Sequence, residues 1–301
     1  MADRLTVIGA PSSAGAYAPG QERAPRALRE AGLLHNLRGH GIAVDDAGDT
    51  AETRWRTDRS NPLAMNVGPV VQTVRAVSDR VSAALARPGS SVLVLGGDCT
   101  VGVGTVAGAL DRGNVGLVYV DHDADLKTPS TTEEGALDWM GVAHLLGVEG
   151  TVGELAAVGP RVPLLSPDQV LLFGQVDPTA SERRIIEDHD MAWVPHDNVR
   201  EDPVGAAEWV VTDWATRFDN LLVHLDIDVV DFADAPLAEN TRRNVGLKLD
   251  TMFAALERLV AAPNWCGLTV CEINPDHGEP DGTTLDEFAT RLAQVLAGGF
   301  R

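Results

Sequence analysis

The strongest restriction on this chain comes from residues 118–120, a short apolar run that leads into three carboxylates at Asp121, Asp123 and Asp125. In an extended strand alternate side chains point to the same face, so these three acids are predicted to share one side of the backbone. Closely packed anions repel one another and resist ionisation unless a positive charge lies among them. Because a divalent cation is the usual partner of such a group, the sequence predicts a metal site here.

Two other stretches repeat the pattern of an apolar run that opens into acidic side chains. The run 92–96 leads through an acid to Cys99, and the run 221–225 leads to Asp226 and Asp228. Ligands of α/β proteins bind outside the carboxyl ends of the strands. We therefore interpret all three stretches as strand ends that converge on one metal site.

Apolar runs alternate with segments of helical periodicity along the whole chain, which predicts an α/β fold with a mostly parallel sheet and helices on both faces. No internal repeat or linker interrupts this order, so we expect a single domain over residues 1–301. A capping box is predicted from the spacing of Thr284 and Glu287. Residues 49–66 are expected to form a surface loop. Strands are expected at 5–10, 91–96, 115–121, 169–173, 191–194, 221–226 and 267–273, and helices at 20–36, 69–86, 101–110, 136–146, 179–188, 203–218, 247–261 and 283–296.

The charge and cysteine content restrict the partners and the compartment of the protein. A net charge of −20 argues against nucleic acid or an anionic membrane as partner and suits a cationic ligand, although solubility alone would also explain the surface acids. Cys99, Cys266 and Cys271 cannot form a paired disulfide framework, and we interpret the last two as packing residues. No apolar run reaches the roughly 18 residues of a membrane span, and no leader is evident, so a cytoplasmic location is expected.

Taken together, these residues resemble the arginase and agmatinase family, the ureohydrolases, over nearly the whole chain. The order and spacing of the motifs make the resemblance specific. The motifs are Ile8-Gly9-Ala10-Pro11, residues 23–33, Gly96-Gly97-Asp98, residues 121–125, Thr128-Pro129, Asp177-Pro178, Asp226-Ile227-Asp228 and Glu272-Ile273-Asn274-Pro275.

The resemblance implies a three-layer α/β/α fold with a mostly parallel sheet of about eight strands and a two-manganese cluster at the strand carboxyl ends. In that family the metals activate a bridging hydroxide, which attacks a guanidinium carbon and releases urea. Two cations lower the pKa of a shared water by many units, so this chemistry is physically sound. The family also implies a homo-oligomer, usually a trimer or a hexamer.

The sequence departs from the family at three functional positions. The family supplies four aspartates and two histidines as ligands, and the aspartates correspond here to Asp121, Asp125, Asp226 and Asp228. The two histidine positions hold Cys99 and Asp123 instead. The histidine that serves as proton shuttle in the family falls by count on Asp138.

These changes alter the charge of the metal site. Five carboxylates with a Cys99 thiolate carry two more negative charges than two divalent cations balance. Compensation is expected from Lys127, from a cationic guanidinium substrate, from a protonated carboxyl or thiol, or from a ligand that does not bind, so the site could hold one metal instead of two. A thiolate also favours Fe²⁺ or Zn²⁺ over Mn²⁺. Cys99 resembles the cysteine of a branch that acts on Nω-hydroxyarginine, whereas an inert buried thiol is the alternative.

Residues that would contact the substrate are assigned by the resemblance. Glu272 corresponds to the acid that pairs with the substrate guanidinium, and Asp177 to the acid near the α-amino group. The positions that hold the arginine carboxylate in arginases fall on Lys127 and Glu134. Lys127 could itself bind a carboxylate, so an ω-guanidino acid stays a candidate substrate.

The histidines allow two interpretations. His224 lies two residues before Asp226, where it would be either a replacement ligand and proton carrier or a histidine hydrogen-bonded beneath the site. His122 would face away from the acids on a strand, as a core or supporting residue. His144 falls within a helical pattern and is interpreted as structural.

We therefore predict a metal-dependent amidinohydrolase that cleaves a guanidino compound to urea or a substituted urea plus an amine. The substrate would be an arginine derivative such as Nω-hydroxyarginine, or an ω-guanidino acid or amine. Asp121 and Asp226 would bridge the metals, Glu272 would orient the guanidinium, and Asp138 or His224 would carry the proton. The alternatives are a non-hydrolytic relative that binds a metal or ligand, and a hydrolase of a related C–N bond.

Overall fold

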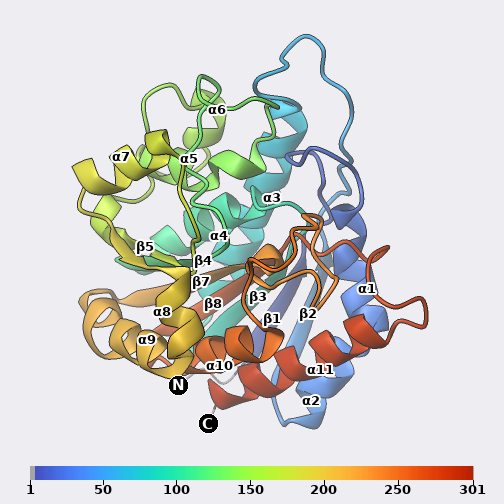
Figure 1. Ribbon diagram of the computed structural model, residues 1–301. Coiled ribbons are helices and arrows are strands. Elements are labelled where there is room, and N and C mark those ends of the chain that lie inside the picture. The colour runs from blue at the N-terminus through green and yellow to red at the C-terminus, as the bar shows by residue number, and fades with distance from the viewer. Residues whose placement is uncertain (1–3, 301) are drawn as a thin grey trace.

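The computed structural model describes residues 4–300, and its centre is a sheet of eight parallel strands in the order β2-β1-β3-β8-β7-β4-β5-β6 (Figure 1). The predicted α/β class with about eight parallel strands is confirmed. The strands are β1 (Arg4–Gly9), β2 (Ala43–Asp49), β3 (Ser90–Leu95), β4 (Val115–Val120), β5 (Val170–Phe173), β6 (Ala192–Val194), β7 (Asn220–Asp226) and β8 (Trp265–Cys271).

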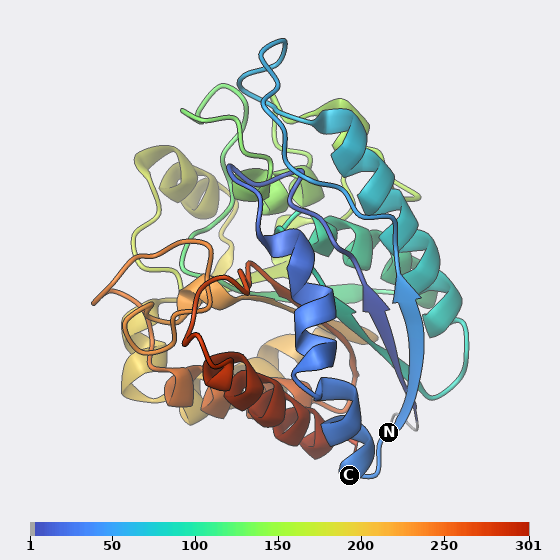
Figure 2. The same ribbon diagram turned by 90° about the vertical axis from the view of Figure 1, so that its right-hand side faces the viewer.

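Helices cover both faces of this sheet, which gives three layers (Figures 1 and 2). One face carries α3 (Val67–Leu85), α4 (Val101–Ala109), α5 (Gly141–Leu146), α6 (Gly153–Ala156) and α7 (Ala180–Asp188). The other face carries α1 (Ala24–Glu30), α2 (Leu33–Gly39), α8 (His196–Glu201), α9 (Pro203–Trp209), α10 (Leu249–Val260) and α11 (Thr283–Gly298). Within residues 4–300, none of these helices combines the length and the apolar character that crossing a membrane requires.

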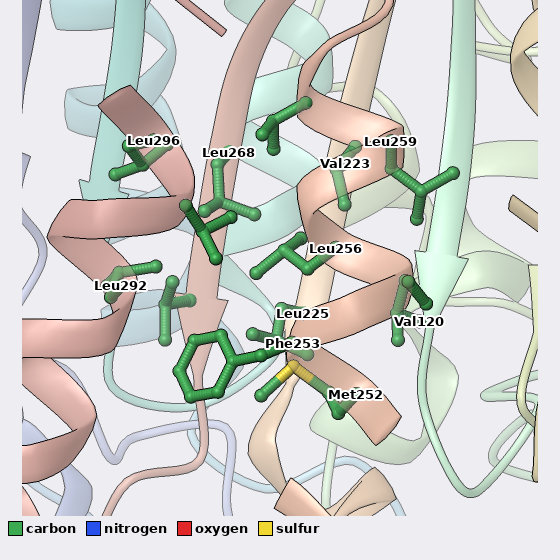
Figure 3. Close-up of a cluster of buried hydrophobic side chains, with 14 of the residues drawn as sticks. Val120, Val223, Leu225, Met252, Phe253, Leu256, Leu259, Leu268, Leu292 and Leu296 are labelled. Atoms are coloured by element: carbon green, nitrogen blue, oxygen red, sulfur yellow. The ribbon is translucent and has the colours of Figure 1, made fainter. Parts of the chain in front are cut away.

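The central strands are apolar on both sides because helices cover both of their faces. On one side, Phe253 and Leu256 of α10 pack with Leu225 of β7 and Leu268 of β8, next to Leu292 of α11 (Figure 3). Fully burying one such side chain contributes about 1.5–3 kcal/mol. This continuous burial explains why the strands are continuous apolar runs in the sequence.

Small residues let α4 lie close to its neighbours. A Cβ atom added to Gly104 would lie 2.5 Å from the carbonyl oxygen of Val74, and one on Gly108 would lie 2.4 Å from that of Ser78, both in α3. The helix predicted here is present, and it consists of small residues because larger side chains would not fit between the backbones of α3 and α4. This contact holds α4 against α3, and α4 begins two residues after Cys99.

Several predicted helices are shorter or divided. The helix expected over residues 20–36 is interrupted at Gly32, whose φ of 80° ends α1 and begins α2. The segment 136–146 forms a 3₁₀ turn at Asp138–Met140 before α5, and the segment 203–218 changes into a π-helical turn at Val210–Trp214 after α9. These breaks are local changes of backbone geometry, which apolar periodicity does not detect.

The predicted capping box at α11 was wrong. The N-cap is Gly282, with a φ of 82°, and the hydroxyl of Thr284 accepts a hydrogen bond from the Glu279 amide instead. The prediction also missed β2, which is polar because it forms the edge of the sheet and pairs only with β1 among the described strands.

Acidification is expected to destabilise the fold through His144. The buried imidazole contacts the carbonyl oxygen of Met140 through Nδ1 at 2.6 Å and accepts the Val152 amide proton at Nε2 at 3.1 Å, so it must be neutral. Burial lowers the pKa of His144 to about 4. Because an unfolded histidine has a pKa of about 6.5, stability is lost as the pH falls from about 6.5 towards 4, by up to about 3 kcal/mol.

Denaturant unfolding at a series of pH values measures this loss. His144→Gln keeps one donor and one acceptor but cannot take up a proton, so its stability should depend less steeply on pH in this range. His35→Gln, at an exposed site of α2, is the matched control and should behave as wild type. Equal pH slopes for wild type and His144→Gln would contradict the prediction.

Candidate metal centre

The carboxyl ends of the four central strands bring the predicted ligands together. β3, β8, β7 and β4 are neighbours in the sheet, and they are followed or ended by Cys99, Glu272, Asp226 and Asp121, respectively. Parallel strands place these ends at one edge of the sheet. Residues separated by up to 173 positions in the chain thereby become direct partners, as in the hydrogen bond from the Cys99 amide to Glu272 Oε1 at 2.9 Å.

These side chains surround a cavity of about 20 Å³, which is enough space for a water molecule or a single ion. All six predicted ligands and two of the predicted catalytic residues line it. The lining residues are Tyr17, Cys99, Asp121, Asp123, Asp125, Asp138, Trp139, Asp226, Asp228, Asn240 and Glu272.

The three acids after β4 converge by a different geometry from the one predicted. β4 ends at Val120, and the backbone then turns, with Asp125 in the left-handed region at a φ of 50°. Asp121 and Asp125 point inwards next to Cys99, whereas the side chain of Asp123 is 44% exposed. The prediction of one shared strand face was therefore wrong, because the strand does not extend into the acidic segment.

The possible ligand atoms form overlapping groups of three, within which all atoms lie within 4.8 Å of one another. Their members are Cys99, Asp121 and Asp125; Cys99, Asp226 and Glu272; and Asp121, Asp123 and Asp228. Adjacent groups share Cys99 or Asp121. This spacing suits cation coordination by several side chains at once.

Asp121 provides a direct test of whether a cation fits. Its Oδ1 accepts the Asp123 amide proton at 2.6 Å, but its buried Oδ2 has no hydrogen-bond partner within residues 4–300. Buried carboxylate oxygens without a partner are costly and rare. Because Asp121 lines the cavity, a divalent cation there would satisfy this oxygen, and the residues present fit a metal.

The acids in the cavity suppress one another's ionisation. Burial, followed by repulsion from neighbouring acids, raises the pKa values of Asp121 and Asp226 well above the ordinary range. Burial and the charge of Asp123 raise the pKa of Asp228 to about 6. A bound cation would reverse this effect, because it favours the ionised form of each carboxyl.

Cys99 links the cavity to the layer beneath it. Its Sγ donates to Asp226 Oδ2 at 3.2 Å and lies 3.2 Å from Nε2 of His224. Burial, followed by contact with Cys271 and the charge of Asp226, raises the pKa of the Cys99 thiol well above its ordinary value. This shift favours the thiol over the thiolate assumed in the sequence-based charge count.

His224 lies beneath the site and does not line the cavity. Its ring stacks on Tyr119 with centroids 4.3 Å apart and an interplanar angle of 3°. Burial lowers the pKa of His224 to about 3, so the ring is neutral near pH 7. Of the two interpretations from the sequence, this position favours a supporting residue that contacts Cys99.

Cys271 lies close to the candidate metal ligand Cys99, which the sequence did not indicate. Its Sγ lies within 4.8 Å of both Cys99 Sγ and a ring nitrogen of His224, so it belongs to a second, softer group of possible ligands. Both Cys266 and Cys271 are packed in the apolar core, as predicted. The packing interpretation of Cys271 therefore holds, although it omitted the neighbouring Cys99 and His224.

The cation that pairs with the acids is Arg242, which sequence reasoning missed. Both terminal nitrogens of Arg242 donate to the carboxylate of Asp123, and Nη1 also lies 3.0 Å from Nδ1 of His122. Burial alone would raise the pKa of Asp123, but the hydrogen bond from Arg242 outweighs it and lowers that pKa. Lys127, the predicted counterion, lies over the ring of Trp139 at 4.5 Å and makes no ion pair within the described residues.

Other lining residues also escaped the sequence analysis. Tyr17 and Trp139 flank the cavity with ring centroids 6.1 Å apart, and Asn240 donates to Asp228 Oδ2 at 3.2 Å. Gln21 donates to Glu272 Oε2 at 3.0 Å. These residues come from separate loops and short 3₁₀ turns without a repeating pattern, so no local signal identifies them.

Three residues assigned to the substrate, Lys127, Glu134 and Asp177, are not among the described residues that line this cavity. Asp177 is exposed and forms an ion pair with Arg183 at 2.9 Å, and Glu134 is also exposed. The contact of all three with a substrate therefore stays a prediction.

Comparison with known proteins agrees with this geometry. The chain matches the family model described as the arginase family over residues 3–298. It is 30% identical to the arginase of Glaciozyma antarctica over 283 residues, which cover 90% of this chain and 81% of that one. It is 28% identical to the arginase of Bacillus subtilis over 292 residues, 96% of this chain and 97% of that one.

Comparison with a solved structure shows that the chain has the fold of an arginase. The crystal structure of an arginase from Bacillus subtilis has a TM-score of 0.85 to this chain at 24% identity, and 98% of each chain is covered. Enzymes of this family typically use a divalent metal, in agreement with the oxygen-rich cavity. The chain therefore belongs to the arginase family of hydrolases.

Proposed function

We propose that the protein hydrolyses a guanidino compound and releases urea or a substituted urea plus an amine. The observation that carries this proposal is the placement of Glu272, a buried carboxylate, in the same cavity as Asp121 and Asp226. A cationic amidine group entering the cavity would meet this acid directly beside the candidate metal ligands Cys99 and Asp226. Such a group also supplies the positive charge that the crowded acids require.

Glu272 is held firmly for this role. Its Oε1 accepts the Cys99 amide proton and its Oε2 accepts a proton from Gln21, while its backbone lies in the left-handed region at a φ of 64°. This conformation costs a non-glycine residue about 1–3 kcal/mol, and such strain concentrates at functional sites. The carboxylate is thus fixed before a ligand binds, which favours orientation of a planar guanidinium.

The ligand set suits a divalent metal. The candidates to hold it are Cys99, Asp121, Asp123, Asp125, Asp226 and Asp228. When bound, the metal lowers the pKa of a water molecule and supplies the nucleophile for hydrolysis. Carboxylate oxygens favour Mn²⁺, whereas the sulfur of Cys99 favours Fe²⁺ or Zn²⁺, so we propose Mn²⁺ with these two as competitors.

Asp138 is proposed as the general acid. Its buried carboxyl lines the cavity, and burial together with the charge of Glu272 raises its pKa well above the ordinary value. A raised pKa favours the protonated carboxyl, which can deliver its proton to the leaving nitrogen. His224 fits this role less well, because it lies behind Cys99 and is neutral.

The walls of the cavity favour a substrate with an apolar stem. Tyr17 and Trp139 present aromatic surface at the lining, and the ammonium of Lys127 lies over Trp139. We propose that Lys127 binds a carboxylate at the far end of the substrate, with Asp177 near an amino group. This arrangement would suit an arginine derivative such as Nω-hydroxyarginine or an ω-guanidino acid. A cytoplasmic location and a trimeric or hexameric assembly stay predictions.

A substrate panel tests the proposal. Urea or hydroxyurea release is measured from arginine, agmatine, guanidinobutyrate and Nω-hydroxyarginine, with Mn²⁺, Fe²⁺, Zn²⁺, Ni²⁺ or Co²⁺ supplied. A formimino compound is included as the related C–N substrate. Turnover of at least one guanidino compound is expected, and turnover of the formimino compound alone would contradict the proposal.

Replacing Glu272 with glutamine is expected to lower kcat/KM for the guanidino substrate by about 100-fold, because an amide cannot neutralise a buried guanidinium. Steady-state kinetics that separate kcat from KM measure the loss. Glu279→Gln, at an exposed site nearby, is the matched control. Unchanged kinetics for Glu272→Gln would show that the acid does not contact the substrate.

A further inference from the structure

Arg242 lies on the loop between β7 and α10 and reaches back to the acids of two different strand ends. It donates to both oxygens of Asp123, and its Nη2 lies 3.6 Å from Oδ2 of Asp228. The side chain of Arg242 is 38% exposed and that of Asp228 only 8%, so the guanidinium lies nearer to solvent than the Asp228 carboxylate. One side chain thus bridges two candidate metal ligands.

These two acids belong to one group of candidate ligand atoms, formed by Asp121, Asp123 and Asp228. The other two groups of acids share Cys99 and lie on the inner side, without contact to Arg242 in the described part of the chain. The cavity therefore has an inner position that is open to a cation and an outer position that already has a fixed positive charge.

A metal at the outer position would compete directly with this charge. It would need the oxygens of Asp123 and Asp228 to which the guanidinium is bound, and it would place two more positive charges within a few ångströms of Arg242. Repulsion between such charges falls only slowly with distance in a partly buried site. Arginine stays protonated under all ordinary conditions, so the competition does not disappear with pH.

Starting from the metal site of the proposed function, we propose that Arg242 replaces the second metal and that this chain binds a single divalent cation at the inner position. The Asp123 carboxylate then serves as the anchor of Arg242 and not as a metal ligand. The guanidinium fills the role of a permanent outer cation, next to His122, whose Nδ1 it contacts at 3.0 Å. This arrangement also balances part of the charge excess expected from the sequence.

Counting bound Mn²⁺ tests the proposal without any measurement of turnover. The whole chain is saturated with Mn²⁺, freed of excess and analysed for metal per chain, and its electron paramagnetic resonance spectrum is recorded. Wild type is expected to hold one Mn²⁺ with the hyperfine sextet of an isolated ion. Arg242→Gln is expected to bind a second Mn²⁺ at least about tenfold more tightly than wild type does, with the spectrum of an exchange-coupled pair.

The controls separate charge from packing. Arg242→Lys keeps a positive charge and should stay at one metal, and Arg243→Gln should also stay at one, because Arg243 lies over the ring of Phe232 at 5.1 Å. Arg242→Met is a second neutral variant in case the glutamine variant does not fold. A coupled pair in wild type, or one metal in a folded neutral variant, would overturn the proposal. Wild type without any bound metal would overturn the metal site itself, whatever the substrate class.

Discussion

Asp226→Asn is expected to abolish stoichiometric metal binding and to lower turnover about 1000-fold. Asp226 lies at the last position of β7, its Oδ1 accepts the Asp228 amide proton at 2.7 Å and its Oδ2 accepts from Cys99. Asparagine can keep the bond to the amide, but it loses the negative charge that a cation requires. A loss of about 4 kcal/mol of transition-state stabilisation corresponds to this decrease.

The free energy of unfolding without metal distinguishes this effect from misfolding. Burial and neighbouring acids raise the pKa of Asp226, so its ionised form destabilises the metal-free fold at neutral pH. The neutral variant should therefore be at least as stable as wild type when metal is removed. Asp188→Asn, at an exposed site of α7, is the matched control for both measurements. An active, metal-loaded Asp226→Asn enzyme would rule out this carboxylate as a ligand.

Gly97→Ala is expected to destabilise the fold by about 3 kcal/mol or more, because the new methyl group meets backbone. A Cβ atom on Gly97 would lie 1.7 Å from the carbonyl oxygen of Ser12. That oxygen accepts the Asp98 amide proton at 2.8 Å, and the Ser12 hydroxyl donates to Asp98 Oδ2 at 2.7 Å. The clash would separate the loops after β1 and β3 and displace Cys99.

Thermal unfolding checks this prediction, with an expected decrease of Tm by roughly 5–10 °C. Gly68→Ala is the matched control, because Gly68 lies in α3 with open space around its Cβ position. Alanine there should leave Tm unchanged or raise it slightly, since it favours helix by about 1 kcal/mol over glycine. A Gly97→Ala protein that melts like wild type would show that the two loops are not in close contact.

The sequence by itself determined the α/β fold, because buried parallel strands must be continuous apolar runs and the helices between them must be amphipathic. It also determined which chain segments meet in the cavity. Asp121 directly follows β4 and Asp226 ends β7, so placing those strands in one parallel sheet is sufficient to bring the two acids together, whereas Glu272 was assigned by the family resemblance alone. The local apolar pattern and the parallel direction of the strands were sufficient to predict both the fold and the meeting of these segments.

Only the tertiary structure decided which charges face one another. Asp123 and Asp125 are two residues apart and looked equivalent in the sequence, yet Asp125 lies inwards beside Cys99 and Asp123 pairs with Arg242. Arg242 stands 119 positions from Asp123 on a loop without periodicity. The direction of a side chain after a strand end depends on φ at each turn and on the partners that other loops present, and neither is written in the local sequence.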